Sequence, residues 1–504
     1  MSRIDECRIA VDNPQQVDTT IFATEDVPIE TAAVDELLGV LELQHTVEKF
    51  AEASPGSFST EPCLERVAVT PDFHKAKGIP VGTVLATRGF VVPQAIGSDI
   101  NCGMRLHTTD VKVDAVKANL DALEDRFRHI FFEGGRNLPM TRTQREGLLR
   151  EGLQGLLNTT PATMEDGLWK CFHEARIGQK LGRVDQRGSL PSSTTTGLEN
   201  FLGNSDRPVR DQVTGCIGGG NHFVEVQYVE KIHDGAAAHA WGLRQGMVTV
   251  MVHTGSVAVG HIAGEHYRSL VKALHPSTLR HPDNGIFVLP TGEAHAATTT
   301  AFWDALHNAA NFAFANRLFL SLMAWSAMRE VLGDFDLPLL YDAPHNLLWR
   351  DSDAPDSRVI HRKGACTARG YDAMAGSEFE CFGEPVLVPG SMGASSYVLA
   401  GNGLDGSLSS ASHGAGRVLS RGEAAHGFDA EFDRFMRDFR VVTPVDLRRP
   451  DIALRRDIVD KKLQALKEEA PYAYKGIAPI IDTIGKSGIA RVVAELRPLM
   501  TMKG

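Results

Sequence analysis

Cysteine is scarce in this chain, with seven among 504 residues. The seven are odd in number, scattered, and form no CxxC pair. This pattern argues against a disulfide framework and against a zinc finger. Most of them are expected to be buried apolar side chains. They are Cys7, Cys63, Cys102, Cys171, Cys216, Cys366 and Cys381.

Long apolar runs are also missing. No run reaches the roughly 18 residues that a membrane-spanning helix needs. The first residues, MSRIDECRIAVDNPQQ, contain no apolar signal-peptide core. We therefore expect a cytoplasmic protein with no membrane partner.

An excess of positive charge is absent, since the formal net charge is −11. Proteins that bind nucleic acid through bulk charge are usually basic, so any such contact here is expected to be a local patch. The chain has no Walker A loop and no GxGxxG after a strand. HTGSVAVG lacks the GxSxG elbow of serine hydrolases.

The distribution of glycine predicts the fold. Residues 1–60 are a lead-in with helical apolar spacing over 31–53. From Val67 onward, dense glycines separate short apolar runs, which is typical of β-strands joined by turns. Residues 110–212 are polar and helix-prone, and are expected to form a peripheral helical excursion. Chemistry-bearing motifs are spread over 72–417, so we predict one large α+β domain, residues 61–504, with a β-rich core carrying the site and helices around it.

Two segments are predicted to be long helices. Residues 293–332 contain no glycine or proline and are expected to form one or two well-buried helices. Asn308, Asn311, Asn316 and Arg317 place polar groups there, either as helix-packing hydrogen bonders or as supports of a site. Residues 450–470 have the pattern of a charged amphipathic helix.

The stretch GSDINCGMR places Asp99 three residues before Cys102 in a glycine-bounded turn. Six histidines also lie beside glycines or turns, where sites are commonly built. With three histidines, Asp99 and Cys102 make an O, S and N donor set. Such a set suits zinc, or manganese or magnesium beside a phosphate, and the spacing alone does not choose. The six are His74, His222, His253, His345, His361 and His413.

GCIGGGNHFVE offers backbone N–H groups at residues 218–220, followed by Asn221 and Glu225. Clustered N–H groups suit phosphate oxygens. A single carboxylate accepts both N1–H and N2–H of guanine, which other bases do not offer together. An ordinary hairpin turn is the alternative reading. VPGSMGASS and SSASHGAGR repeat the pattern of small residues followed by polar ones.

Nine motifs in order resemble the RtcB family of RNA ligases over residues 61–504. The helical excursion is the poorest match. No single motif is decisive, but nine in order are highly specific. They are PDFH, GSDINCGM, GGGNHFVE, HTGS, NAANFAFANR, PHN, HRKGA, PGSMG and SHGAGR…SR.

The resemblance implies an enzyme that joins RNA ending in a 2′,3′-cyclic phosphate or 3′-phosphate to RNA with a 5′-hydroxyl, using GTP and two Mn²⁺ ions. His413 would accept GMP on its imidazole. Asp99, Cys102 and His222 would hold one Mn²⁺. Cys102, His253 and His345 would hold the other, with the thiolate bridging.

The resemblance also implies the nucleotide contacts. Glu225 and Lys503 would read guanine with Tyr474 against it, and Arg417 would meet the phosphates. The full implied set is Asn221, His222, Phe223, Val224, Glu225, His345, Asn346, Pro389, Gly390, Ser391, Met392, Ser396, His413, Gly414, Ala415, Gly416, Arg417, Tyr474 and Lys503.

Three departures from the family pattern point to a divergent paralogue with a different preferred end. HTGS is followed by Val257 where the family commonly has arginine, HRKGACTARG carries extra small residues, and SDIN replaces VDIG. Losing a phosphate-facing cation is expected to weaken RNA end binding.

Three alternatives stay open. The first is a transferase that caps 3′-phosphate ends with GMP but seals poorly. The second is a dinuclear metal phosphoesterase that uses no nucleotide. The third is a non-catalytic RNA-binding protein. The sequence identifies neither the physiological RNA nor an activating protein.

Overall fold

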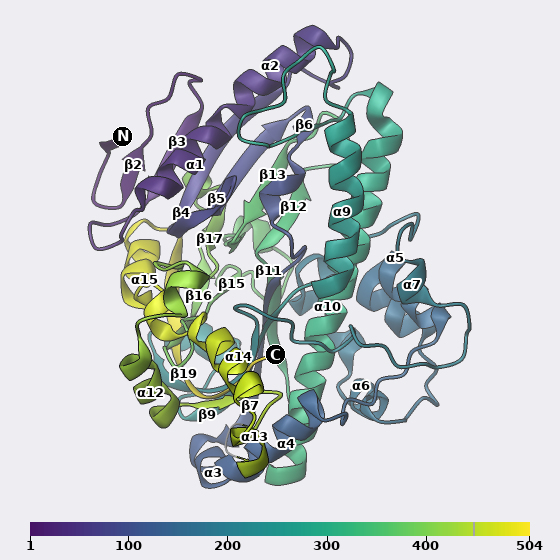
Figure 1. Ribbon diagram of the computed structural model, residues 1–504, viewed down its shortest axis with the longest axis vertical. Helices are drawn as coiled ribbons and strands as arrows, with labels where there is room; N and C mark the ends of the chain where they lie inside the picture. The colour runs from purple at the N-terminus through teal and green to yellow at the C-terminus, as the bar shows by residue number, and fades with distance from the viewer. Residues whose placement is uncertain (447–448) are drawn as a thin grey trace.

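Two large β-sheets form the centre of the computed structural model (Figure 1), which describes residues 1–446 and 449–504. The first sheet has seven strands and includes part of the N-terminal segment, because β3 pairs in parallel with β4. In spatial order its strands are β1 (Ser2–Arg3), β2 (Arg8–Ala10), β3 (Asp18–Phe22), β4 (Cys63–Lys77), β5 (Ile79–Arg88), β13 (Val359–Lys363) and β12 (Asn346–Arg350).

The second sheet has eight strands, and its central strands carry most of the chemistry described below. The central strand β9 reads MVTVMVHT and is buried along seven of its eight residues, which suits its apolar and β-branched composition. In spatial order the strands are β11 (Leu339–Pro344), β7 (Gly103–Lys112), β9 (Met247–Thr254), β8 (Phe223–Ile232), β19 (Ala490–Met502), β16 (Ser396–Gly401) and β15 (Pro385–Val388), with β18 (Arg440–Val442) beside β19.

Two small sheets join the large ones. β6 (Phe90–Val91) pairs with β10 (Leu289–Pro290), and β14 (Ala365–Thr367) pairs with β17 (Ser410–Ser412). The second pair holds β17 in place and so positions His413, the residue that directly follows β17.

A single long helix runs beside the sheets (Figure 1). This helix, α10 (Ala296–Leu332), has 37 residues and is buried almost all around its middle. It ends at Gly333, where φ is +86° and a side chain would be strained. The expectation of one or two buried helices over 293–332 is therefore met by one.

The other helices cover the outer faces. Several helices, separated by loops, lie between residues 113 and 202, within the stretch 110–212 that was expected to be a helical excursion, and α5 packs on α10. The helices are α1 (Thr31–Leu41), α2 (Leu43–Ala53), α3 (Val113–Ala118), α4 (Leu120–Phe132), α5 (Arg142–Thr159), α6 (Leu168–Glu174), α7 (Glu199–Leu202), α8 (Gly235–Ala240), α9 (Val257–Ala273), α11 (Arg421–Ala424), α12 (Asp429–Asp438), α13 (Pro450–Ala453), α14 (Arg456–Lys467) and α15 (Ile477–Lys486).

One helix prediction is wrong in its extent. Residues 450–470 were expected to form one helix, but α13 and α14 are separated at Leu454 and Arg455. Arg455 leaves the helical conformation with φ −91° and ψ 72°. In the described part of the chain, no helix is both long and apolar enough to cross a membrane.

Candidate functional site

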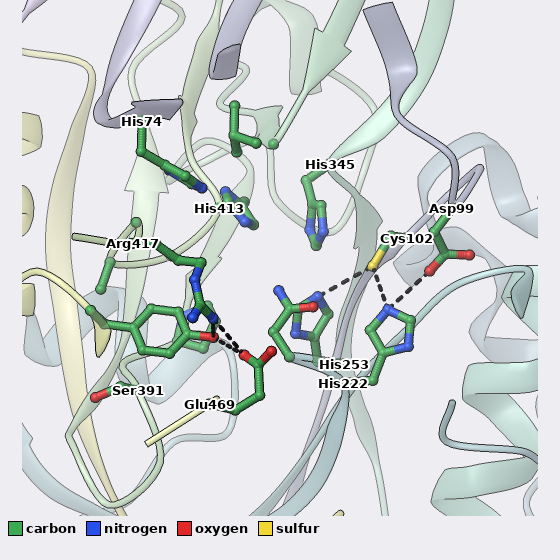
Figure 2. Close-up of a pocket in the computed structure, with 18 of the residues that line it drawn as sticks. His74, Asp99, Cys102, His222, His253, His345, Ser391, His413, Arg417 and Glu469 are labelled. Carbon is green, nitrogen blue, oxygen red and sulfur yellow. Dashed lines mark hydrogen bonds and ion pairs between the residues drawn. The ribbon is translucent and has the colours of Figure 1, made fainter. Parts of the chain in front are cut away.

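A cavity of about 360 Å³ opens where the two sheets and the loops between them meet (Figure 2). Its walls come from distant parts of the chain: β4, the turn before β7, the start of β8, the ends of β9 and β11, and the loop after β17. Residues from 74 to 503 in the sequence therefore share one space.

The turn Gly97–Cys102 delivers an acid and a thiol to this cavity. The backbone N–H of Cys102 donates to the carbonyl of Asp99 at 3.2 Å, which closes the turn. Gly103 is required next, because a Cβ there would lie 2.5 Å from the carbonyl oxygen of Ala343 on the neighbouring strand. Tight pairing of β7 with β11 thus explains why glycine follows Cys102.

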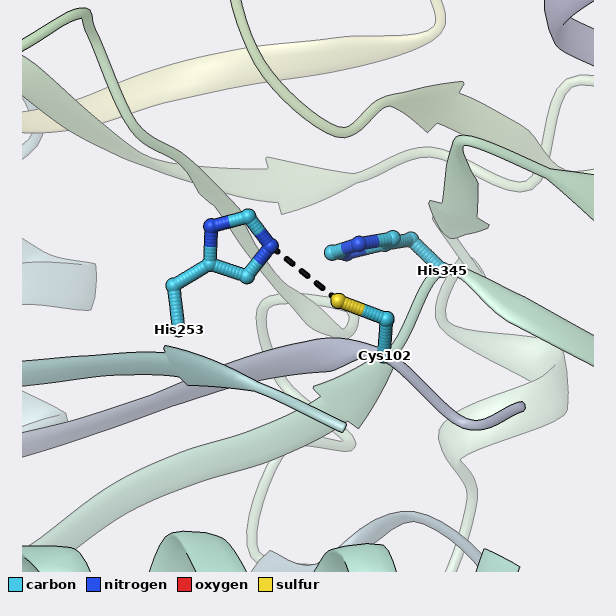
Figure 3. Close-up of side chains that lie close together, drawn as sticks. All are labelled: Cys102, His253 and His345. Atoms are coloured by element: carbon cyan, nitrogen blue, oxygen red, sulfur yellow. Dashed lines mark hydrogen bonds between the residues drawn. The ribbon is translucent and has the colours of Figure 1, made fainter. Parts of the chain in front are cut away.

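Five potential metal ligands form two triplets that share Cys102. One triplet is Asp99, Cys102 and His222, and the other is Cys102, His253 and His345; within each, the ligand atoms lie within 4.8 Å of one another. The Cys102 Sγ lies 3.3 Å from Nε2 of His222 and 3.3 Å from Nε2 of His253. Figure 3 shows the thiol beside the rings of His253 and His345.

The hydrogen bonds around His222 test whether a cation fits. Its Nδ1 lies 3.1 Å from the carbonyl oxygen of Ile217, so Nδ1 carries the proton and Nε2 keeps a lone pair. That Nε2 faces the Asp99 carboxylate at 2.9 Å (Figure 2) as well as the Cys102 sulfur. Three electron-rich atoms therefore converge, an arrangement that a bound cation stabilises.

Burial controls the protonation of these groups. Burial, followed by the nearby Asp99 charge, raises the pKa of the Cys102 thiol well above its ordinary value. Burial and the neighbouring histidines lower the pKa of His253 and of His345, so both imidazoles are neutral and can act as ligands. Burial raises the pKa of Asp99, but the adjacent His222 imidazole and the hydrogen bond from the Val257 N–H outweigh it and leave that pKa below its ordinary value.

His413 follows β17 and lies on the side of His345 that faces away from Cys102 (Figure 2). The ring centroids of His413 and His345 are 4.6 Å apart. The Nδ1 of His413 lies 2.6 Å from Oδ2 of Asp72, a fully buried carboxylate on β4. Burial raises the pKa of Asp72, but its electrostatic contact with the His413 ring and hydrogen bonds from His413 and Thr70 hold it below its ordinary value. Asp72 therefore accepts a hydrogen bond from Nδ1–H, which fixes the tautomer in which the Nε2 lone pair of His413 is available.

Acidic and cationic side chains line the other end of the cavity. Glu225 accepts hydrogen bonds from Gln227, at 2.6 Å, and from Thr501. Burial raises the pKa of Glu225 to about 7 and lowers that of Lys503 to about 8. The Lys503 ammonium donates to the carbonyl oxygens of Gly220 and His222.

Arg417 and Tyr474 form a connected group at this end. The Arg417 guanidinium lies 5.0 Å from the Tyr474 ring centroid. It donates to Glu469 at 3.0 Å (Figure 2). Tyr474 also donates to Glu469. Arg421 pairs with the same carboxylate at 2.9 Å, so Glu469 holds two guanidiniums at the cavity wall.

The polar residues of α10 divide into two roles. Asn308 and Asn311 bind the segments at 190–194 and 149, which ties the helix to the peripheral excursion. Asn316 instead holds the backbone at Gly215, Cys216 and Gly255. Arg317 donates to the carbonyls of Asn101 and Thr254, beside Cys102 and His253.

Most of the predicted site residues line the cavity. Two do not: Val224 is buried in the apolar core, and Ser396 is buried and accepts a hydrogen bond from Gln227. His361, one of the six histidines, lies on β13 and accepts from the backbone N–H of Val92. Those lining the cavity are Asp99, Cys102, Asn221, His222, Phe223, Glu225, His253, His345, Asn346, Pro389, Gly390, Ser391, Met392, His413, Gly414, Ala415, Gly416, Arg417, Tyr474 and Lys503.

Sequence reasoning missed several residues of the site. Asp72 sits inside the PDFH motif, which gave the one available signal. Lys363 follows the histidine of HRKGA and lines the cavity, with burial lowering the pKa of its amine to about 8. Arg421 ends the SHGAGR…SR motif but was given no role, and Glu469 lies in a stretch with no recognisable motif.

Similarity to known proteins identifies the family of this chain. A family model described as "tRNA-splicing ligase RtcB" matches residues 57–504. The chain belongs to the RtcB family. The "tRNA-splicing ligase RtcB" of Thermococcus kodakarensis is 31% identical over 95% of this chain and 95% of its own length. The "RNA-splicing ligase RtcB" of Mycobacterium tuberculosis is 33% identical over 86% of this chain and 96% of its own.

Val257, the position at which the RtcB resemblance leads us to expect arginine, has an unusual backbone. It begins α9 with φ +42°, a left-handed conformation that is costly for a β-branched residue. Its backbone N–H donates to Oδ1 of Asp99 at 2.9 Å. The strained residue therefore supports a predicted metal ligand through its main chain.

Proposed function

We propose that this protein is an RNA ligase that joins an RNA end carrying a 2′,3′-cyclic phosphate or 3′-phosphate to an RNA end with a 5′-hydroxyl, with GTP and two Mn²⁺ ions. The observation that carries the proposal is the convergence, in one cavity, of two ligand triplets sharing Cys102 with His413 on the far side of His345. Membership of the RtcB family supports the reaction class. A cytoplasmic location is part of the proposal.

His413 is the proposed nucleophile. Because Asp72 accepts a hydrogen bond from Nδ1–H, Nε2 keeps its lone pair and attacks the α-phosphorus of GTP, an N–P bond forms, and pyrophosphate leaves. A 2′,3′-cyclic phosphate end is first opened by water to the 3′-phosphate. The N–P bond to His413 then breaks as GMP passes to an oxygen of that 3′-phosphate, which becomes a phosphoanhydride. The 5′-hydroxyl attacks the phosphorus of the RNA phosphate, its proton is lost, and GMP departs.

The donor set fits two divalent ions that share a thiolate. Asp99, Cys102 and His222 would hold one, and Cys102, His253 and His345 the other. When bound, Mn²⁺ neutralises negative charge that develops on phosphoryl oxygens. Arg317 fixes the carbonyls of Asn101 and Thr254 and so keeps the Cys102 and His253 backbones in place.

The other end of the cavity is proposed to hold the nucleotide. The Glu225 carboxylate would accept the N1–H and N2–H of guanine, beside the Lys503 ammonium, with Tyr474 against the base. Arg417, and the backbone of Gly414–Gly416, would meet phosphate oxygens, because guanidinium and N–H groups pair well with them. The loops around Asn221, Asn346 and residues 389–392 complete the proposed enclosure.

Ligation is tested with two short RNAs, one ending in a 3′-phosphate and one beginning with a 5′-hydroxyl. With GTP and Mn²⁺ we expect a sealed product that resists phosphatase, and none with His413→Ala. A 5′-phosphate acceptor is the matched control and should not be joined. Sealing by His413→Ala would contradict the mechanism.

Val257 favours a second candidate, a transferase that caps 3′-phosphate ends but seals poorly. In the same assay a capped RNA, with the 5′-hydroxyl strand unconsumed, would support it. Val257→Arg would then be expected to increase sealing by supplying a cation near the RNA end. Loss of the 3′-phosphate without any nucleotide would instead favour the phosphoesterase.

A further inference from the structure

A second cavity of about 340 Å³ lies apart from the site just described. It is enclosed by η2 (Ile177–Arg183), the second half of α10, and the segment that leads into β11. The two cavities share no lining residue. Its volume is within the range of natural small-molecule pockets.

One part of the wall is apolar. Leu153, Leu318 and Leu322 are each at most 2% exposed and border the space. The Trp325 indole N–H donates to the Phe335 carbonyl at 2.8 Å, so the polar atom of that ring is already satisfied. These side chains offer a surface for a hydrocarbon or aromatic body.

Another part of the wall is positively charged. Arg105 is 3% exposed, and it donates from Nε to His107 and from Nη1 to Asp342. Asp342 also receives the guanidinium of Arg317 at 2.8 Å. Two buried guanidiniums therefore share one carboxylate, and this buried trio carries an excess positive charge.

Lys180 adds a second cation to the wall. Among the described residues it has no ion pair within 4.0 Å, and burial lowers the pKa of its amine. The acids that border the cavity are Glu174, which is paired with Arg329, and the exposed Asp336. Arg176 also borders it, so cations outnumber acids around the space.

We propose that this cavity is a binding site for a small organic anion, with its carboxylate or phosphoester head on Arg105 and Lys180 and its apolar body against Leu153, Leu322 and Trp325. A planar guanidinium pairs well with both kinds of head group. Such a ligand neutralises the excess charge of the Arg105, Asp342 and Arg317 trio while it buries the apolar wall. This site does not depend on the proposed RNA ligase activity.

The fluorescent anion 8-anilinonaphthalene-1-sulfonate is a suitable probe, titrated into the full-length protein with saturating GTP present. We expect one saturable site, and at least tenfold weaker binding in Lys180→Met, which keeps the side-chain stem at the half-buried rim. Lys49→Met, an exposed lysine on α2, is the matched control and should bind the probe unchanged. The uncharged N-phenyl-1-naphthylamine should bind at least tenfold more weakly than the sulfonate.

Displacement separates the two head groups. Competition by 4-phenylbutyrate supports a carboxylate ligand, and competition by phenyl phosphate supports a phosphoester. Failure of both to displace the probe would overturn the proposal, as would equal probe binding in Lys180→Met. A probe that binds without GTP but no longer binds with saturating GTP would lie in the first cavity, and this would also overturn the proposal, whether or not the protein ligates RNA.

Discussion

The contact between Asp72 and His413 decides which nitrogen of His413 is nucleophilic. The two residues are 341 positions apart, and their atoms meet at 2.6 Å because β17 packs beside β4. A carboxylate on Nδ1 both orients the ring and fixes its tautomer. The same arrangement positions histidine in other nucleophilic sites.

Replacing Asp72 by asparagine is expected to reduce the rate of GMP transfer to His413 by about 10²–10⁴-fold, because the wrong tautomer is then favoured. Metal content should not change, since Asp72 is outside both ligand triplets. Single-turnover labelling with α-labelled GTP, together with elemental analysis, measures both. An unchanged rate would show that Asp72 does not position His413.

The buried Glu225 carboxylate is expected to lower the free energy of unfolding above about pH 7, because its charged form is costly to bury. Burial raises the pKa of Glu225 from 4.5 to about 7 in the folded protein. The stabilisation from its protonated form is therefore present below about pH 4.5 and is lost as pH rises through about 7. Glutamine at this position keeps that neutral form at every pH.

We therefore expect Glu225→Gln to raise the free energy of unfolding at pH 8 by about 2–3 kcal/mol, with no gain near pH 4.5. Chemical denaturation at the two pH values measures this difference. The same variant should lose its preference for GTP over ATP in the labelling reaction. A pH-independent difference in stability would contradict the assigned protonation.

The identities of single site residues were easier to predict from the sequence than the contacts between them. Asp99, Cys102 and the three ligand histidines carry recognisable motifs, and the structure brings them together. The proposed roles of these residues remain predictions, because no ligand contact tests them. Asp72 and Glu469 were missed because their importance comes from partners distant in sequence, and no local pattern reports such a contact.

At the level of elements, α10 connects the peripheral helices to the site. Asn311 and Asn316 are both fully buried on this helix, but they hold different segments. Asn311 binds the backbone at Leu149 and Leu190, whereas Asn316 binds the loop that leads to His222. The sequence offered both a structural and a site-supporting interpretation of these amides, and the helix contains one of each.

This difference gives a matched pair of variants. Asn311→Ala and Asn316→Ala should each lower the free energy of unfolding by about 2–4 kcal/mol, because each leaves several buried backbone groups without a partner. Only Asn316→Ala should also weaken Mn²⁺ binding, as measured by calorimetry. Equal metal affinity in the two variants would contradict a site-supporting role for Asn316.

Element boundaries were less predictable than element types. The helical character of 293–332 follows from its composition, but its continuation as a single 37-residue helix depends on burial against β9, α5 and α9. The break at Leu454 and Arg455 could not be predicted, because the only helix-interrupting residue nearby is Pro450, which begins α13. The domain boundary expected between residues 60 and 61 remains a prediction. β3 of the lead-in pairs directly with β4 on the other side of that boundary.

At the scale of the whole molecule, the ligand triplets include residues of the second sheet and a residue in the connection between the two sheets. Cys102 precedes β7, His253 ends β9, and His345 stands between β11 of the second sheet and β12 of the first. A metal bound by all three would hold both sheets in place. Folding and the proposed metal binding would therefore be coupled.

Chelation should accordingly lower the melting temperature. At a free Mn²⁺ concentration 100-fold above its dissociation constant, the bound ion is expected to contribute about 2.7 kcal/mol to the free energy of unfolding. Calorimetric scans before and after chelator treatment measure this change, and Mn²⁺ should restore the original value. Cys102→Ala should show no such response, because it removes the ligand common to both triplets.

The central claim, nucleotide transfer to His413, is tested most directly by incubating the purified protein with α-labelled GTP and Mn²⁺, followed by denaturing electrophoresis. The account predicts a labelled protein band that is absent in His413→Ala and present in His426→Ala, an exposed histidine used as the control. No band from a folded protein shown to contain metal would contradict the account, as would a band that survives His413→Ala.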